Sequence, residues 1–434
     1  MSVSVRNVVF FVLLAGLFVL AGFERGANWS LGVFNYGLIA AIMALGVNMQ
    51  WGYAGLFNIG VMGFVALGGV ATVLISMPPV TEAYAAGGTQ VVAGVLLGAA
   101  TVVAAVLAWS RLPKGRLRGA AVVAILGVGF FVYRAVFDPA VEAIEDVNPA
   151  STGYLGGLGL PVLIAWPIGG LLAAGAAWVI GKTALGLRSD YLAIATLGIA
   201  EIIVAVVKNE EWLVRGVKNV NGIPRPVPQE IDLQNSERFV ENAAGFGLDP
   251  VLASTLWVKV NYSILLIVVL LVLLWLSQKA LNSPWGRMMR AIRDNEVAAE
   301  AMGKDVTKRH LQIFIIGSAI CGLAGAMLIT MDGLHNPTAY QPLRYTFLVW
   351  VMVIVGGSGN NYGAVLGGLL IWFLWNDVEA RGPQIMSIIT SGMPEGSWLK
   401  QHLIDGAAHM RLFTMGLILV LVLRFSPRGL IPER

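Results

Sequence analysis

The sequence is poor in charged residues, cysteine and histidine. Asp, Glu, Lys and Arg make up 12% of its 434 residues, against roughly 25% in an ordinary soluble domain, which excludes a soluble enzyme and a disordered chain. Its one cysteine, Cys321, excludes a disulfide framework and a cysteine-based metal cluster, and its apolar surroundings predict a small buried side chain. The four histidines, at positions 310, 335, 402 and 409, have no ligand spacing, so we expect no metal site.

Apolar residues are abundant instead. They make up 57% of the chain, and its 52 glycines follow no fixed period, which excludes collagen and is typical of packed transmembrane helices. The mean hydropathy is +0.75. A helix needs about 20 apolar residues to cross a bilayer. Twelve runs approach that length, at 8–22, 31–49, 53–76, 90–109, 119–137, 160–181, 190–207, 261–277, 311–330, 345–358, 361–376 and 409–424. We therefore predict an all-α polytopic integral membrane protein with about 10–12 transmembrane helices in one domain over 1–434.

Three of these regions are irregular. The run 53–76 is rich in glycine, so we expect a break in it. The runs 345–358 and 361–376 are short and separated by a glycine turn, which fits either two thin spans or one re-entrant pair. The first run resembles a signal peptide in length, but Glu24 and Arg25 follow it without a small-residue cleavage site, so we expect an uncleaved first helix.

Basic residues occur in alternate links between the runs. The link 110–118 has four bases and no acid, whereas the link 138–150 has four acids and no base. The segment 278–310 has seven bases against four acids, and the loop 208–260 has six bases against seven acids. Threading the twelve runs puts every basic link on one side of the membrane. The positive-inside rule then predicts that both termini are cytoplasmic and that the loop 208–260 is extracytoplasmic.

One motif is misleading. Residues 176–183, AAWVIGKT, fit the loosest form of a phosphate-binding loop, but Ala176 replaces the first glycine. The four middle residues complete an apolar run, where their N–H groups are bonded within the helix. We interpret Lys182 as a cytoplasmic anchor instead. We expect no catalytic residues and no nucleotide or other cofactor bound by this chain, and we assign no nucleic-acid partner.

The segment 283–306 predicts two short cytoplasmic helices. Ser283 and Pro284 suit a helix start, and Asp294-Asn295 offers a second cap. A cationic ridge follows at steps of three, formed by Arg287, Arg290 and Arg293. The second helix carries Glu296 and Glu300 and a small-residue patch of Ala298, Ala299 and Met302, and Gly303 suits its end. A basic loop on anionic lipid is the simpler interpretation, but a capped, Ala-rich helix favours a protein docking site.

Five blocks of sequence resemble the LivM-type permeases of the branched-chain amino acid ABC importer family. They are GVNMQWGYAGLFNIGVMGF at 46–64, LRSDYLAIATLGIAEII at 187–203, residues 283–325, VIVGGSGNNYGAVLGG at 353–368 and RFSPRGLIPER at 424–434. They occur in the family's order. The sequence departs from the family in two apolar runs added within 78–160 and in Asn360-Asn361, which replaces bulkier apolar residues.

The resemblance implies a permease subunit without its own ATPase, in the inner membrane. Its expected partners are a sister permease, two cytoplasmic ATP-binding subunits that use ATP and Mg, and an extracytoplasmic substrate-binding protein. The resemblance also implies that the segment 283–306 couples to the ATPase through a loose Glu-Ala-Ala…Gly motif at Glu296, Ala298, Ala299 and Gly303. Branched-chain amino acids are the expected substrates, with urea or short amides as the alternative.

Five polar residues are candidates for the translocation pathway. Asp190 and Glu201 are eleven residues apart, close to three helical turns, so both lie on one face. Glu201 either lines the path between the two permeases or pairs with a neighbouring helix, because a charge at mid-span costs roughly 2.5–3.5 kcal/mol. Asn48, Gln50 and Asn58 either line the path or cross-link helices. An ion-driven secondary transporter is the rival class, but it would have paired intramembrane charges and inverted repeats.

Overall fold

The structure is a computed structural model that describes residues 5–394 and 396–433. Each of the twelve apolar runs coincides largely with a long helix, as predicted. These helices are α1 (Val5–Arg25), α2 (Ala27–Val47), α3 (Val61–Ser76), α5 (Thr89–Arg111), α6 (Arg116–Glu145), α7 (Val162–Ala184), α8 (Ser189–Asn209), α12 (Pro250–Leu281), α15 (Val306–Asp332), α16 (Pro342–Gly356), α17 (Asn361–Ile389) and α19 (Met410–Phe425). Residues 176–183, which loosely match a phosphate-binding loop, lie inside α7, so their backbone N–H groups are hydrogen-bonded within a helix.

Short elements connect the long helices. They are α4 (Thr81–Ala83), α9 (Glu211–Val214), α10 (Glu230–Gln234), α11 (Glu237–Gly245), α13 (Pro284–Asp294), α14 (Glu296–Ala301), α18 (Trp398–Asp405), π-helical turns at Asn48–Gly52 and Tyr84–Gly88, and 3₁₀ turns at Pro337–Ala339 and Gly406–His409. Two strands of two residues each, β1 (Val220–Asn221) and β2 (Leu334–His335), pair antiparallel. The loop expected at 208–260 is therefore largely structured, and α12 begins at Pro250 because Asp249 caps it by accepting from the backbone N–H groups of Val251 and Leu252.

Within the described residues, eight helices are long and apolar enough to cross a membrane, or nine if α18 and α19 form one bent span. This is fewer than the 10–12 expected. The difference arises because α3, α16 and α19 have 16, 15 and 16 residues, below the roughly 20 needed, and because α17, although it has 29 residues, is not among the eight sufficiently apolar helices. The break expected in 53–76 is confirmed, since residues 55–60 are not helical.

Helices α2 and α15 form the buried centre of the molecule, and α3, α7, α16 and α17 pack around them. Glycines allow the closest approaches. A Cβ on Gly68 of α3 would lie 1.8 Å from the carbonyl oxygen of Gly322 on α15, and one on Gly322 would lie 2.6 Å from that of Gly169 on α7. Three helices thus meet backbone to backbone at this point.

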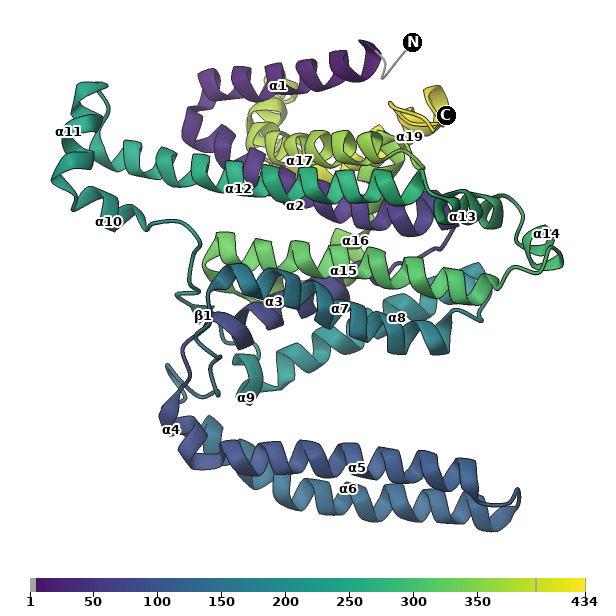
Figure 1. The fold of residues 1–434 in the computed structure, drawn as a ribbon. Helices are drawn as coiled ribbons and strands as arrows, with labels where there is room; N and C mark the ends of the chain where they lie inside the picture. The colour runs from purple at the N-terminus through teal and green to yellow at the C-terminus, as the bar shows by residue number, and fades with distance from the viewer. Residues whose placement is uncertain (1–4, 395, 434) are drawn as a thin grey trace.

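The helices α5 and α6 form a hairpin that lies apart from the other helices in Figure 1. It contacts the rest of the molecule near α4 and α9, at one end of the bundle. Its opposite end carries the basic turn of Lys114. These are the two apolar runs within 78–160 by which the sequence departs from the family.

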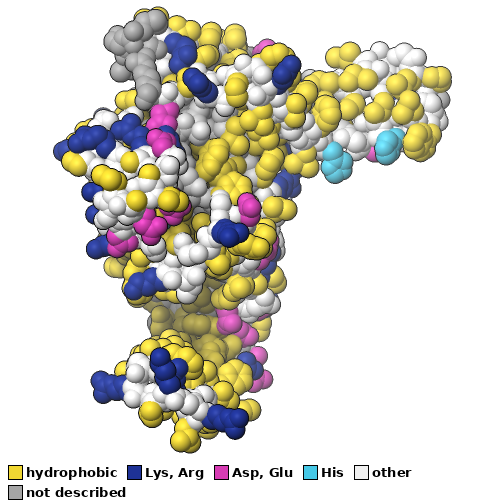
Figure 2. Space-filling view, turned by 90° about the vertical axis from the view of Figure 1, so that its right-hand side faces the viewer, with side chains coloured by type: hydrophobic (Ala, Val, Ile, Leu, Met, Phe, Trp, Pro, Cys, Tyr) yellow, Lys and Arg dark blue, Asp and Glu magenta, His cyan; other side chains and the backbone are white. Residues whose placement is uncertain are grey.

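Figure 1 places both termini at the end of the bundle that carries α13 and α14. Figure 2 views this end, where Lys and Arg side chains gather over the α13–α14 region and on the tip of the α5–α6 hairpin. The basic links therefore share one end of the molecule, as the charge pattern predicts. We call this end the basic end.

Candidate functional site

The helices α13 and α14 form where the sequence predicts them. Helix α13 begins at Pro284, and Asn295 Oδ1 caps α14 by accepting from the N–H of Ala298 at 2.9 Å. Gly303 follows α14 with a φ of +75°, a conformation that glycine adopts without strain. The predicted cap at Ser283 is wrong, because its hydroxyl donates to the carbonyl of Ala280 at 2.6 Å instead.

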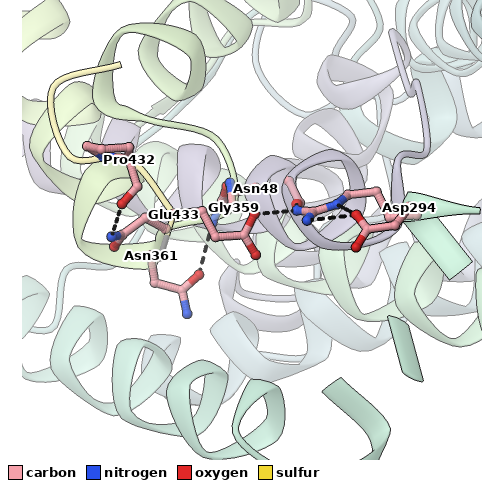
Figure 3. A network of polar contacts seen from close by, with 9 residues as sticks. Asn48, Asp294, Gly359, Asn361, Pro432 and Glu433 are labelled. Carbon is pink, nitrogen blue, oxygen red and sulfur yellow. Dashed lines mark hydrogen bonds and ion pairs between the residues drawn. The ribbon is translucent and has the colours of Figure 1, made fainter. Parts of the chain in front are cut away.

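The three arginines of α13 differ in their surroundings. Arg287 is exposed, whereas Arg290 and Arg293 are half-buried. Arg293 donates from Nη1 to the carbonyl of Gly52 and, at 2.7 Å, to Glu433. Figure 3 shows this ion pair beside Asp294, which Arg293 also contacts at 3.1 Å. Burial alone would lower the pKa of the Arg293 guanidinium, but the carboxylates of Glu433 and Asp294 raise it above its ordinary value.

Arg293 thus joins three parts of the chain that are remote in sequence. Gly52 ends the π-helical turn after α2, and Glu433 belongs to the C-terminal tail. The tail is itself fixed to α16, because the N–H groups of Leu430 and Ile431 donate to the carbonyls of Val355 and Gly356, both at 2.9 Å. Arg293 therefore connects α13 to the end of α2 and, through the tail, to the end of α16.

The glycine turn between α16 and α17 lies against this tail. Gly357 has a φ of +119°, and a Cβ there would lie 2.3 Å from the carbonyl oxygen of Ile431. Asn360 caps α17 by accepting from the N–H of Tyr362 at 3.0 Å, and it donates to the carbonyl of Pro432 at 3.2 Å. This explains why a polar residue occupies position 360, since its side chain is hydrogen-bonded to both the turn and the tail.

Asn48 lies at 0% exposure on the other side of the same turn. Its Oδ1 accepts from the N–H of Gly359 at 2.9 Å, and its Nδ2 donates to Asn361 Oδ1 at 3.0 Å (Figure 3). The side chains of both asparagines in the Asn360-Asn361 pair are thus hydrogen-bonded. Sequence reasoning missed Gly52, Asn360, Asn361 and Glu433 as site residues. The pair of asparagines within an otherwise apolar segment was the sequence feature that could have indicated Asn360 and Asn361.

Gln50 and Asn58 are also buried and hydrogen-bonded. Gln50 Nε2 donates to the carbonyl of Phe314 at 2.9 Å and to Ser318 Oγ at 3.0 Å, which ties the π-helical turn to α15. Asn58 Nδ2 donates to Gln50 Oε1 at 2.9 Å, and its backbone carbonyl accepts from the indole of Trp350 at 3.0 Å. In this conformation these amides cross-link the helices around the break in 53–76.

Asp190 and Glu201 share one face of α8, as their spacing predicts, and both are exposed. The opposite face of α8 packs on the segment before α3. Thr196 Oγ1 accepts from the N–H of Ile59 at 3.1 Å, and on α3 itself a Cβ on Gly63 would lie 2.9 Å from Cα of Ala200. Among the described residues no hydrogen bond or ion pair engages Glu201. It lies apart from the network around Arg293.

The small-residue patch of α14 is divided by its packing. Ala299 is 9% exposed and lies in a small core with Ile292 and Val306. Ala298, Glu296 and Glu300 are exposed, and Met302 is 79% exposed. The surface that α14 offers to another molecule therefore includes Ala298 and Met302, while Ala299 packs inward.

The residues of the network around Arg293 come from all of the sequence blocks except 187–203, which packs beside the break in 53–76. The polar network links the end of α2, α13, the glycine turn and the tail. This geometry suits a transport protein that is driven from its basic end.

The model of the family "Branched-chain amino acid transport system / permease component" matches residues 117–423, which are 307 of the 434 residues. The chain is 30% identical to the high-affinity branched-chain amino acid transport system permease protein LivM of Salmonella typhimurium over 218 residues, which are 49% of this chain and 50% of that protein. It thus spans about half the length of this relative.

More distant relatives carry other names. The ribose import permease protein RbsC of Haemophilus influenzae is 26% identical over 60% of this chain and 75% of its own length. The permease LivH of Salmonella typhimurium is 26% identical over 43% of this chain and 65% of its own length. No solved structure matches the chain. Because the family model covers more than half of it, the chain belongs to the branched-chain amino acid transport permease family and is a multi-pass membrane permease component.

Proposed function

We propose that this chain is the permease subunit of an ATP-driven importer that moves branched-chain amino acids across the inner membrane into the cell. The basic end faces the cytoplasm, so both termini are cytoplasmic. Helices α3, α16 and α17 add to the eight or nine candidate spans and give eleven or twelve, within the 10–12 predicted, the short ones being enclosed by other helices. The observation that carries the proposal is the position of Arg293, which links α13 to the ends of α2 and α16.

Two ATP-binding subunits bind ATP and Mg and dock on α13 and α14. The exposed Ala298 lets a partner surface approach closely, and the flanking charges of Arg287 and Glu300 orient it. ATP binding displaces α13, and Arg293 transmits the displacement to Gly52 and Glu433. Rigid movement of helices then opens the path alternately to each side.

A sister permease covers the face of α8 that carries Asp190 and Glu201. A carboxylate at mid-span facing lipid costs roughly 2.5–3.5 kcal/mol, and Gly198, one turn before Glu201, has no atom within 4 Å of its Cβ position. A protein partner relieves this cost by supplying donors or a water-filled path. Glu201 then lines the path between the two permeases, and Asn48, Gln50 and Asn58 become available to it when the break in 53–76 rearranges.

The substrate assignment follows the LivM relative. Permeases named for amino acids and for ribose are both among the relatives. Because similar permeases thus carry different substrate names, we assign much of the selectivity to the extracytoplasmic binding protein. It delivers substrate to the end of the bundle that carries the loop 210–249. Urea and short amides are the alternative substrates that the uptake experiment tests.

The test is to purify the tagged chain from its native membrane in mild detergent and to identify the proteins that accompany it. We expect two copies of an ATP-binding subunit and one sister permease, and leucine uptake that requires ATP after reconstitution with the binding protein. A chain that purifies alone and transports without ATP would instead be an ion-driven carrier. Uptake of urea in place of leucine would change the substrate and leave the importer class intact.

A further inference from the structure

A cavity of about 290 Å³ lies among α2, α3, α15, α16 and α17, close to the lower size of ligand sites, about 300 Å³. It opens near Asp332 and Ala339, which are exposed, at the end of the bundle opposite α13. Its walls are mostly apolar, formed by side chains such as Ile39, Met43, Met62, Val65, Leu348 and Met352. Methionines adapt their shape to apolar groups of different branching.

A few polar groups interrupt these apolar walls. The hydroxyl of Tyr36 donates to Oδ1 of Asp332, and among the described residues no donor engages the second oxygen of this carboxylate. The hydroxyl of Tyr340 and the indole Nε1 of Trp372 are buried and have no partner within the described chain, and both residues line the cavity. The Tyr340 side chain is only 4% exposed. Buried donors of this kind are costly unless a ligand or water accepts from them.

The charge of Asp332 is available to a ligand. Arg225 is a cation close to it, since its guanidinium lies 3.2 Å from the Cβ position of the adjoining Gly333. Arg225 forms an ion pair with Glu230 at 3.2 Å, which takes up part of its charge. The mouth therefore presents a carboxylate with one free oxygen, followed by an apolar chamber with two unengaged donors.

We propose that this cavity binds a zwitterionic amino acid with a short, branched apolar side chain, within a single permease subunit. The ammonium group binds Asp332, the side chain fills the methionine-lined wall, and the carboxylate accepts from Tyr340 and Trp372. A sugar would leave hydroxyl groups unpaired against this wall, and urea would leave most of it unfilled. The inference rests on the proposed importer function and assigns the substrate class to a place in this chain.

The test uses the complete transporter complex in lipid nanodiscs and measures binding of radiolabelled L-leucine in the absence of the binding protein. Asp332→Asn should weaken leucine binding at least tenfold, and Ala339→Trp, which places a bulky side chain at the mouth, should abolish it. The matched controls are Asp138→Asn, a half-buried carboxylate of α6 that pairs with Arg134 and does not line the cavity, and Leu343→Trp, an exposed position that does not line it either. Both should bind leucine as the unmodified complex does.

Two analogues distinguish a binding role from loss of fold. 3-Methylbutylamine lacks the carboxylate and 4-methylpentanoate lacks the ammonium group, so the unmodified complex should prefer leucine over both. In Asp332→Asn the preference of leucine over 4-methylpentanoate should disappear. If both Asp332→Asn and Ala339→Trp bind and transport leucine normally, the cavity is not the site, although ATP-dependent uptake would still support the importer. Loss of ATP dependence in the unmodified complex would overturn the proposed function instead.

Discussion

Replacing Arg293 by Met should uncouple transport from ATP hydrolysis. The side chain makes charge-assisted hydrogen bonds to Gly52 and Glu433, and bonds to charged groups contribute about 1.5–3 kcal/mol each. Arg293 and Glu433 are each 25% exposed, so solvent screening favours the lower value. Loss of both bonds removes about 3 kcal/mol of coupling, which corresponds to roughly a hundredfold at tenfold per 1.4 kcal/mol.

The assay is leucine uptake per ATP hydrolysed in proteoliposomes that contain the whole complex. Arg293→Met should lose up to about a hundredfold in this ratio while the ATP-binding subunits still hydrolyse ATP. Arg293→Lys retains a point charge that reaches one of the two acceptors, so its loss should be about tenfold. Glu433→Gln should lose less than Arg293→Met, and the double variant should equal Arg293→Met, because both changes remove the same ion pair.

The control is Lys308→Met, an exposed base at the start of α15 outside the network. It tests whether loss of any positive charge near the ATPase surface lowers the ratio. If Arg293→Met transports with an unchanged ratio, or if Lys308→Met is equally impaired, the coupling role of Arg293 is refuted.

Three further predictions follow from packing and burial. Ala298→Trp should block co-purification of the ATP-binding subunits with the chain still folded, whereas Ala299→Trp, at a buried position, should lower the melting temperature of the chain itself; equal loss of docking with no difference in melting would contradict this division. Gly68→Ala should destabilise the bundle by about 1–3 kcal/mol because its Cβ would lie 1.8 Å from the carbonyl of Gly322, while Gly175→Ala, in open space, should be neutral or stabilising in the same thermal unfolding measurement. Burial lowers the pKa of His335 from its ordinary 6.5 to about 4, so the unfolded chain takes up a proton on this residue before the folded chain does. The free energy of unfolding should therefore be complete above pH 6.5 and about 3 kcal/mol lower at pH 4. The same measurement on His335→Leu should lack this pH-dependent loss.

The sequence predicted the helices well because each is a local feature. Apolar runs and glycine breaks depend on neighbouring residues, so the interruption in 53–76 and the short helices α13 and α14 were found. The ends of the helices were harder to predict from the sequence. The start of α12 at Pro250 depends on the cap at Asp249, in a stretch of mixed polarity that extends the apolar run beyond its visible edge.

The contacts of the site could not be predicted in the same way. The bonds of Arg293 to Gly52 and Glu433 join residues 241 and 140 positions apart, and no local pattern fixes such a pairing. The inward packing of Ala299 is likewise set by Val306 and Ile292 across a turn. The arginine ridge predicted a charged surface correctly, but its spacing alone did not reveal which arginine joins the helices.

The proposed cavity and the Arg293 network use the same two helices, which explains how a force at one end reaches a ligand at the other. Met43 of α2 lines the cavity, and Asn48, which begins the π-helical turn directly after α2, binds the glycine turn; the two residues are five positions apart, about 7.5 Å along a helix. On α16, Met352 lines the cavity and the end at Gly356 holds the tail. Because a packed helix moves as a rigid unit, we expect release of Glu433 or Gly52 by Arg293 to shift cavity walls on both helices together. A change that loosens the Arg293 network should therefore alter leucine affinity as well as coupling, and Glu433→Gln, which touches no cavity residue, is the variant in which binding of radiolabelled leucine would detect it.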